Sequence, residues 1–99
     1  MIVDCLMFAG ESDMLECRLT ELESRVDRFV IVEATETHQG TPRLLTFDVD
    51  RFGRWPIVYV PTTVSGVDAW AREAAQRDAL IEGLDGVPDS ALVVVSDVD

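Results

Sequence analysis

Lysine is absent from this chain of 99 residues, and histidine occurs once, as His38. Without lysine there is no side-chain amine to form a Schiff base, which excludes reactions that proceed through one. A phospho-receiver domain would also need a lysine on a late strand, so that class is excluded too. A single histidine argues against a serine triad and against a histidine-based metal site.

Cysteine and long apolar runs are scarce as well. Cys5 and Cys17 are the two cysteines, and neither belongs to a C-x-x-C motif or has a histidine nearby. We therefore expect two buried free thiols in a reducing compartment, with no zinc site and no disulfide framework. The N-terminus lacks the basic residues and long apolar core of a signal peptide, and no apolar run approaches a membrane-spanning length. The sequence predicts a cytoplasmic protein without a membrane span.

The charge of the chain is strongly one-sided. Its formal net charge is −11, and all eight basic residues are arginines. This balance argues against a surface for nucleic acid or anionic lipid, both of which require basic patches. It suits a site that gathers cations. A hydrophobic content of 47% is ample for a core and excludes a disordered chain. The length predicts one small domain over residues 1–99.

Apolar runs alternate with helical periodicity along the chain. A first helix is expected from about residue 12 to residue 26, and a second from about Val67 to Leu84. Four strands are expected, at Ile2–Phe8, Arg28–Ala34, Ile57–Val60 (closed by Pro61) and from Leu92 onward. The alternation predicts an α/β, Rossmann-like fold with a mostly parallel sheet in the order 3-2-1-4, which is half of a nucleotide-binding domain.

The first helix has a candidate start and a candidate buried face. Ser12 or Asp13 can cap it, and with Asp13 as the cap Glu16 completes a capping box. The residues expected to face the core are Leu15, Leu19, Leu22 and Val26. Between the second and third strands we expect a long functional loop, with a short strand at Leu44–Phe47.

The second helix combines an apolar stripe with charges. Its expected buried face consists of Trp70, Ala74, Ile81 and Leu84. Glu73 and Arg77 share that face, four residues apart. They form either an ion pair at the edge of the core or, through Arg77, a phosphate contact. Arg72 and Gln76, further round the helix, have the same two interpretations.

The last strand ends in two carboxylates. Leu92 to Val95 is apolar and β-branched, which is typical of a strand buried on both faces, and Asp97 and Asp99 follow it. Ligands of open parallel sheets bind beyond the carboxyl ends of the strands. Carboxylates suit Mg²⁺ or Mn²⁺, which can in turn hold a diphosphate. The same Asp-x-Asp letters at Asp48–Asp50 follow no buried strand and are expected to be a solvated loop or turn.

Two further residues are candidates for nucleotide contacts. Glu33 ends the second strand, where a ribose hydroxyl or a base is often held, although a solvated strand end is the alternative. Arg43, in the following loop, is either a phosphate contact or a surface charge.

Three blocks carry a family resemblance. MIVDCLMFAGESDMLECRLTELESRVDRFVIVEATETHQGTPRLL, WAREAAQRDALIEGL and LVVVSDVD resemble, in this order, the glycosyltransferase family 17 proteins. These are relatives of β-1,4-mannosyl-glycoprotein N-acetylglucosaminyltransferase. Gly10 departs from the family, in which relatives often carry Asn before Glu11.

The resemblance implies a three-layer GT-A-type fold that uses a nucleotide sugar with Mn²⁺ or Mg²⁺. Asp97 would touch the ribose or a metal-bound water, and Asp99 would ligate the metal. The nucleotide pocket would be lined by Glu11, Glu33, Arg43, Arg72, Gln76 and Arg77.

The expected function is that of a metal-dependent glycosyltransferase with a UDP-linked donor, UDP-GlcNAc or similar, represented here by its donor-binding portion. The acceptor site and the catalytic base are expected beyond Asp99, so the 99 residues alone should be inactive in transfer. The alternative is a truncated nucleotide-binding module without transferase activity.

Overall fold

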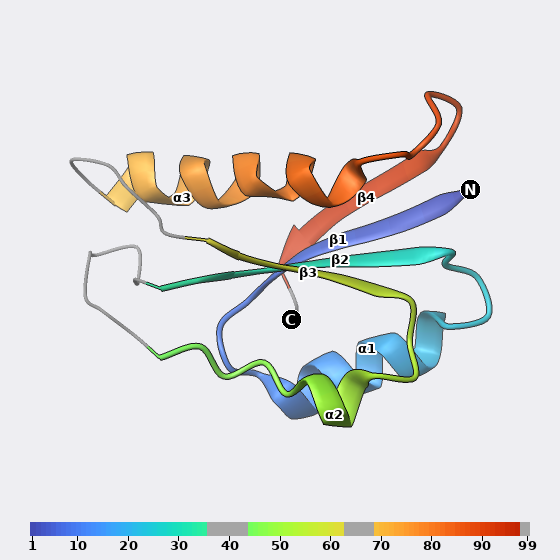
Figure 1. The fold of residues 1–99 in the computed structure, drawn as a ribbon, viewed down its shortest axis with the longest axis horizontal. Coiled ribbons are helices and arrows are strands. Elements are labelled where there is room, and N and C mark those ends of the chain that lie inside the picture. Colours follow the sequence, from blue (N-terminus) through green and yellow to red (C-terminus); the bar gives the residue numbers. More distant parts are fainter. Residues whose placement is uncertain (36–43, 63–68, 98–99) are drawn as a thin grey trace.

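The computed structural model describes residues 1–35, 44–62 and 69–97, without the side chains of residues 69, 72, 73, 76, 77 and 97. Within these ranges a four-stranded sheet forms the centre of the molecule (Figure 1). Its strands are β1 (Ile2–Phe8), β2 (Arg28–Ala34), β3 (Ile57–Thr62) and β4 (Leu92–Asp97). All pairs are parallel and the order is β3-β2-β1-β4, which confirms the predicted topology. β3 continues through Pro61 to Thr62, beyond its expected end.

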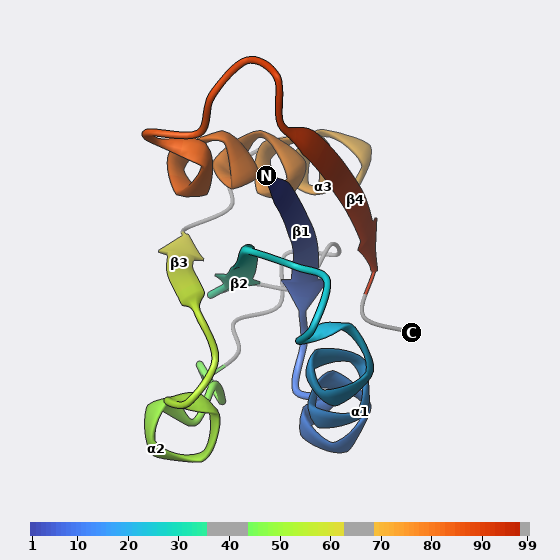
Figure 2. The same cartoon turned by 90° about the vertical axis from the view of Figure 1, so that its right-hand side faces the viewer.

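Helices cover both faces of the sheet, giving three layers. α1 (Ser12–Leu22) and the short α2 (Val49–Phe52) lie on one face, while α3 (Ala69–Asp78) lies on the other (Figures 1 and 2). α3 continues directly into a 3₁₀ helix, η1 (Ala79–Leu84). This arrangement confirms the predicted α/β, Rossmann-like fold. None of the helices within the described ranges is long and apolar enough to cross a membrane.

Successive strand residues alternate between two core clusters, as the pleat requires. The cluster beneath α1 and α2 contains Leu6, Phe8, Leu15, Leu19, Phe29, Ile31, Phe52 and Trp55. The cluster beneath η1 contains Val3, Cys5, Val30, Val32, Val60, Ala79 and Leu80. The central strands β1 and β2 contribute to both clusters, so their near-continuous apolar sequences follow from burial on two faces.

The start of α1 differs from the expectation. Its first residue is Ser12, the N-cap is Glu11, and no side chain caps the helix, so the predicted capping box is wrong. Gly10 adopts a left-handed φ of +99°, and the first i→i−4 bond runs from the Leu15 amide to the Glu11 carbonyl at 2.9 Å. The helical path therefore begins before Asp13, which lies inside the first turn. The expected core residues Leu15 and Leu19 are fully buried.

The predicted strand at Leu44–Phe47 is also wrong, since these residues form no strand. The amides of Thr46 and Phe47 donate to the Glu33 carboxylate, not to a neighbouring strand. Asp48 then caps α2, because its Oδ1 accepts from two amides of the first turn, each at 3.1 Å. The first Asp-x-Asp is thus an exposed helix start.

Of the predicted buried face of the second helix, Leu84 is partly buried and packs against the core, whereas Trp70, Ala74 and Ile81 are exposed. Trp70 and Ile81 are 81% and 68% exposed, and the buried residues are Ala79, Leu80 and Gly83. The helix tightens at Ala79 to the three-residue turn of a 3₁₀ helix, which shifts the phase of later side chains such as Ile81. Trp70 and Ala74 precede this switch and are exposed on the regular α3. Gly83 also allows a close approach to Val30.

β4 is not buried on both faces, contrary to the expectation. Its apolar residues from Leu92 to Val95 are between 37% and 60% exposed. Within the described part of the chain it pairs with β1 alone and forms one edge of the sheet, as the end-on view shows (Figure 2). An apolar, β-branched run predicts a strand, but it does not reveal whether other elements cover that strand.

Both cysteines are free, as expected. Cys5 is buried in β1, whereas Cys17 lies on the solvent side of α1, so the expectation that both are buried is wrong for Cys17. Cys17 occupies a helical position between the two core-facing residues Leu15 and Leu19, at a phase that points away from the sheet.

Candidate functional site

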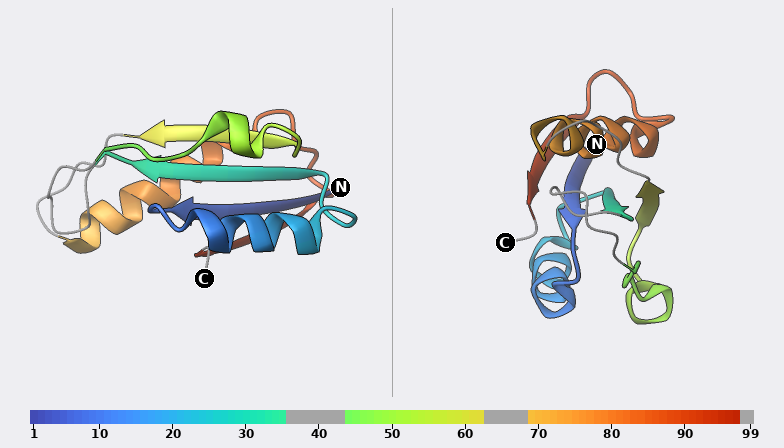
Figure 3. Two further views of the ribbon diagram at one scale, coloured as in Figure 1. Left: turned by 90° about the horizontal axis from the view of Figure 1, so that it is seen from below. Right: turned by 90° about the vertical axis from the view of Figure 1, so that its left-hand side faces the viewer.

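The carboxyl ends of the four parallel strands meet at one edge of the sheet, where the sequence predicts a site (Figure 3). Cα pairing places Glu33 of β2 beside Phe8 of β1, and Asp97 of β4 beside Met7. Two of the predicted site residues therefore flank β1, one register row apart. Ala34 and Asp97, far apart in the sequence, both end strands at this edge.

Glu33 is completely buried at this edge and receives hydrogen bonds on both carboxylate oxygens. Oε2 accepts from the amide and hydroxyl of Thr46 at 2.8 and 3.0 Å. Oε1 accepts from the Phe47 amide at 3.1 Å and the Tyr59 hydroxyl at 2.7 Å. The expected alternative of a solvated strand end is wrong. The nucleotide contact stays a prediction. To bind a nucleotide, the Glu33 carboxylate would have to exchange one of these hydrogen bonds for one from the ligand.

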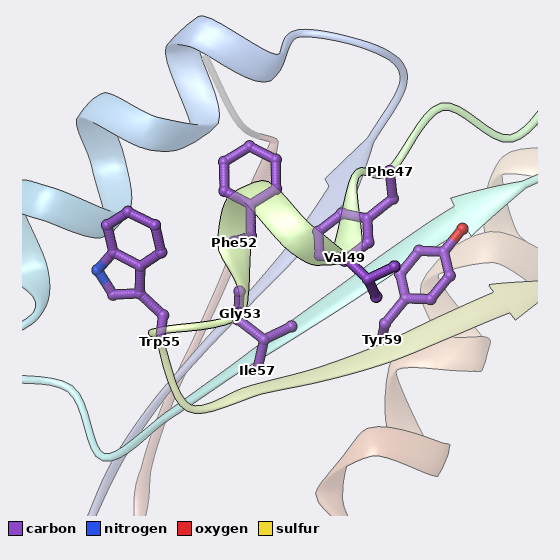
Figure 4. A pocket seen from close by; sticks show the side chains of 7 residues that line it. All are labelled: Phe47, Val49, Phe52, Gly53, Trp55, Ile57 and Tyr59. Atoms are coloured by element: carbon purple, nitrogen blue, oxygen red, sulfur yellow. The ribbon is translucent and has the colours of Figure 1, made fainter.

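An aromatic stack lies beside Glu33. The rings of Phe47 and Tyr59 stack with centroids 4.4 Å apart, and Phe52 stacks on the other side of Phe47 at 5.3 Å. This stack borders an open hollow of about 140 Å³ between α2 and β3 (Figure 4). The hollow is lined by Phe47, Val49, Phe52, Gly53, Trp55, Ile57 and Tyr59. The Phe47–Tyr59 stack helps to hold in place the segment whose amides donate to Glu33.

Glu11 lies in the turn that follows β1, at the same edge. Its Oε1 accepts from the Ala9 amide at 2.7 Å, which stabilises the turn around Gly10. The side chain is partly exposed. Its predicted contact with a donor sugar stays a prediction.

A buried ion pair lies below this edge, and sequence reasoning missed it. Asp4, in the middle of β1, is 2% exposed and binds Arg18 of α1 through both carboxylate oxygens, at 2.6 and 2.7 Å. The same guanidinium donates to the Ser96 hydroxyl of β4 at 2.7 Å. The hydrogen bond to Asp4 raises the pKa of Arg18 above its ordinary value, against the opposing effect of burial.

A signal for this pair was present in the sequence. Asp4 interrupts an apolar run, and a carboxylate in a buried strand requires a partner. Arg18 follows Leu15 by three residues and precedes Leu19 and Leu22 by one and four, so it borders the core-facing side of its helix. An arginine at that phase is the residue type best suited to such a pair.

For the other predicted residues, the structure describes either the backbone without the side chain or no part of the residue. α3, which carries Arg72, Gln76 and Arg77 together with Glu73, begins at the carboxyl edge and runs back along the sheet (Figure 1). Their side chains lie outside the described part of the structure, as does that of Asp97. His38, Arg43 and Asp99 lie outside the described residues altogether.

The profile of glycosyltransferase family 17 matches residues 1–99 of the chain. The chain belongs to glycosyltransferase family 17. No curated protein and no solved structure gives a significant match. Membership of this glycosyltransferase family implies a nucleotide-sugar donor and an acceptor.

Among the described side chains of this family 17 chain, no group of three or more histidine, cysteine, aspartate or glutamate residues is arranged to hold a metal ion. Asp97 and Asp99, the predicted ligands, are not among the described side chains. The described backbone does place residue 97 at the end of β4, at the edge where nucleotide ligands of parallel sheets bind.

Proposed function

We propose that the chain is the donor-binding portion of a metal-dependent glycosyltransferase that uses a UDP-linked sugar, UDP-GlcNAc or similar, with Mn²⁺ or Mg²⁺. One observation carries the proposal beyond family membership. The parallel order β3-β2-β1-β4 brings the end of β4, with Asp97, to the same edge as the ends of β1 and β2.

The acidic end of β4 supplies the cation ligands. In this proposal the carboxylates of Asp97 and Asp99 hold the ion, or Asp97 binds the ribose or a metal-bound water. These hard oxygen donors fit Mg²⁺ or Mn²⁺, which take about six oxygens and leave positions for diphosphate and water. When bound, the ion would neutralise charge on the departing nucleoside diphosphate.

Residues from the other elements complete the donor site. Glu33 and Glu11, at the ends of β2 and β1, are proposed to contact the nucleoside and the sugar. The proposed phosphate contacts are Arg43, Arg72, Gln76 and Arg77. With a net charge of −11 the chain attracts cations and repels diphosphate, so nucleotide binding should depend strongly on the metal ion.

Calorimetry with UDP, in the presence and absence of Mn²⁺, tests this assignment. The wild-type chain should bind UDP only with Mn²⁺, and Asp99→Asn should weaken that binding at least about tenfold, or 1.4 kcal/mol. The chain contains its own control, because Asp50→Asn changes the equivalent letter of the other Asp-x-Asp, which is an exposed helix start. Asp50→Asn should bind as the wild type does.

Two results would contradict the proposal. One is UDP binding of equal strength with and without Mn²⁺. The other is an equal effect of Asp99→Asn and Asp50→Asn, which would show that the loss follows from charge alone and not from the position at the end of β4.

A further inference from the structure

The hydrogen-bonded chain Asp4–Arg18–Ser96 joins β1, α1 and β4 one residue before Asp97. We propose that Asp4 and Arg18 are positioning residues, which fix the end of β4 through Ser96 and so place Asp97 for binding of the cation and the nucleotide. This inference rests on the proposed function, but its structural part can be tested independently.

The geometry fixes the orientation of the guanidinium. Nε and Nη2 of Arg18 donate to the two oxygens of Asp4 at 2.7 and 2.6 Å, so two parallel bonds hold one plane. Nη2 also donates to Ser96 Oγ at 2.7 Å. Because Asp4 lies in the central strand and is 2% exposed, Ser96 is connected to one of the most rigid parts of the fold.

β4 needs such a connection more than the other strands do. β1 and β2 are buried between two core clusters, whereas the apolar side chains of β4 are 37–60% exposed. Strands with few buried apolar contacts open locally at low free energy. A charge-assisted hydrogen bond at Ser96 therefore restrains the part of β4 that packing restrains least.

The choice of residues supports a role in positioning. A buried ion pair contributes little net stability compared with apolar residues of similar size. Its advantage is a defined geometry, and arginine offers that better than lysine, because one planar fork reaches both the Asp4 carboxylate and the Ser96 hydroxyl. α1 holds Arg18 in place, since Leu15 and Leu19 of the same helix are fully buried.

Ser96→Ala tests the inference with little risk to the fold, because it removes one hydroxyl and leaves the Asp4–Arg18 pair intact. Amide hydrogen exchange at residues 96 and 97 should become at least about tenfold faster, as expected for loss of a hydrogen bond to a charged group. Affinity for Mn²⁺ in the presence of UDP should fall about 10- to 100-fold, the usual effect of removing a group that orients a ligand. Ser96→Thr, which keeps a hydroxyl, should restore both properties.

Ser24→Ala is the matched control, because Ser24 is exposed in the turn after α1. It should leave exchange and affinity unchanged. Arg18→Lys keeps the charge but loses the planar guanidinium group that contacts both Asp4 and Ser96. At temperatures well below its unfolding transition, it should show the same faster exchange and weaker Mn²⁺ affinity as Ser96→Ala.

The outcomes separate this inference from the proposed function. Unchanged exchange and unchanged Mn²⁺ affinity in Ser96→Ala would overturn the inference and leave the proposed function standing. Faster exchange at residue 97 in a protein whose wild type binds no Mn²⁺–UDP would support the restraint of β4 and refute the proposed function. A loss of affinity that Ser96→Thr does not restore would also overturn the inference.

Discussion

Replacing Arg18 by methionine should destabilise the fold severely, because it leaves the carboxylate of Asp4 without its charged partner. The Asp4 side chain is 3% exposed, so water cannot replace the two hydrogen bonds that Arg18 donates. Breaking a buried pair by removing one partner costs about 3–5 kcal/mol. The Arg18 side chain is 19% exposed, which gives water some access and favours the lower value, about 3 kcal/mol.

A loss of this size should be visible by thermal unfolding. For a domain of 60–100 residues each kcal/mol shifts the melting temperature by about 4–8 °C, so Arg18→Met should lower it by about 12–24 °C. The comparison variant is Arg51→Met. Arg51 also contacts two carboxylates, those of Asp13 and Glu16, but on the surface of the protein. Exposed pairs of this kind contribute little, so the shift should be far smaller.

A double variant identifies the cause. Asp4→Val combined with Arg18→Met removes both charges, and should recover most of the stability lost in Arg18→Met, since apolar replacement of a buried pair is often neutral or stabilising. Equal shifts for Arg18→Met and Arg51→Met, or a double variant no more stable than Arg18→Met, would refute the reasoning.

Two further predictions concern the core beneath η1. Burial, reinforced by the charge of Asp4, raises the pKa of the Cys5 thiol from 9.0 to about 11, so the folded state keeps a proton that the unfolded chain loses between these values. The free energy of unfolding should therefore fall by about 3 kcal/mol as the pH rises from 9 to 11, which chemical denaturation at several pH values can measure. Cys5→Ala should lack this component and Cys17→Ala should retain it; equal pH profiles would contradict the assignment. Gly83→Ala should cost about 1–3 kcal/mol, because the added methyl group would overlap the Val30 side chain. Adding Val30→Ala should relieve that overlap, and a Gly83→Ala protein of unchanged melting temperature would show that η1 moves away freely.

The topology of the sheet could be predicted from the sequence, whereas its burial could not. The alternation of apolar runs and helical periodicity predicts a parallel α/β sheet, and the order β3-β2-β1-β4 is one of the common orders of such sheets. The runs in β2 and β4 look alike, but β2 is covered on both faces and β4 is exposed. Whether a strand is covered depends on which helices and strands pack against it, and this cannot be inferred from the residues of the strand itself.

Local geometry limited the remaining predictions. In the second helix, the switch to a 3₁₀ helix at Ala79 breaks the 100° periodicity for the later residues, such as Ile81. The exposure of Trp70, which precedes the switch, depends on which elements cover α3, and its own periodicity does not show that. At the candidate site, the position of Glu33 at a strand end could be predicted, but its burial could not. That burial depends on Thr46, Phe47 and Tyr59, which approach it from two other segments.

The strand order also has a consequence for how the protein folds. β1 pairs with β2 across a short separation, as in Val3 with Arg28, but with β4 across almost the whole chain, as in Val3 with Val93. Closing the longer loop costs about 1 kcal/mol more in chain entropy, and the exposed side chains of β4 return little of it through burial. We expect β1, α1 and β2 to assemble first and β4 to join them late. The acidic end of β4 would then be added to an edge of the sheet that has already formed. Arg18 of α1 would already be in position to donate its hydrogen bond to Ser96.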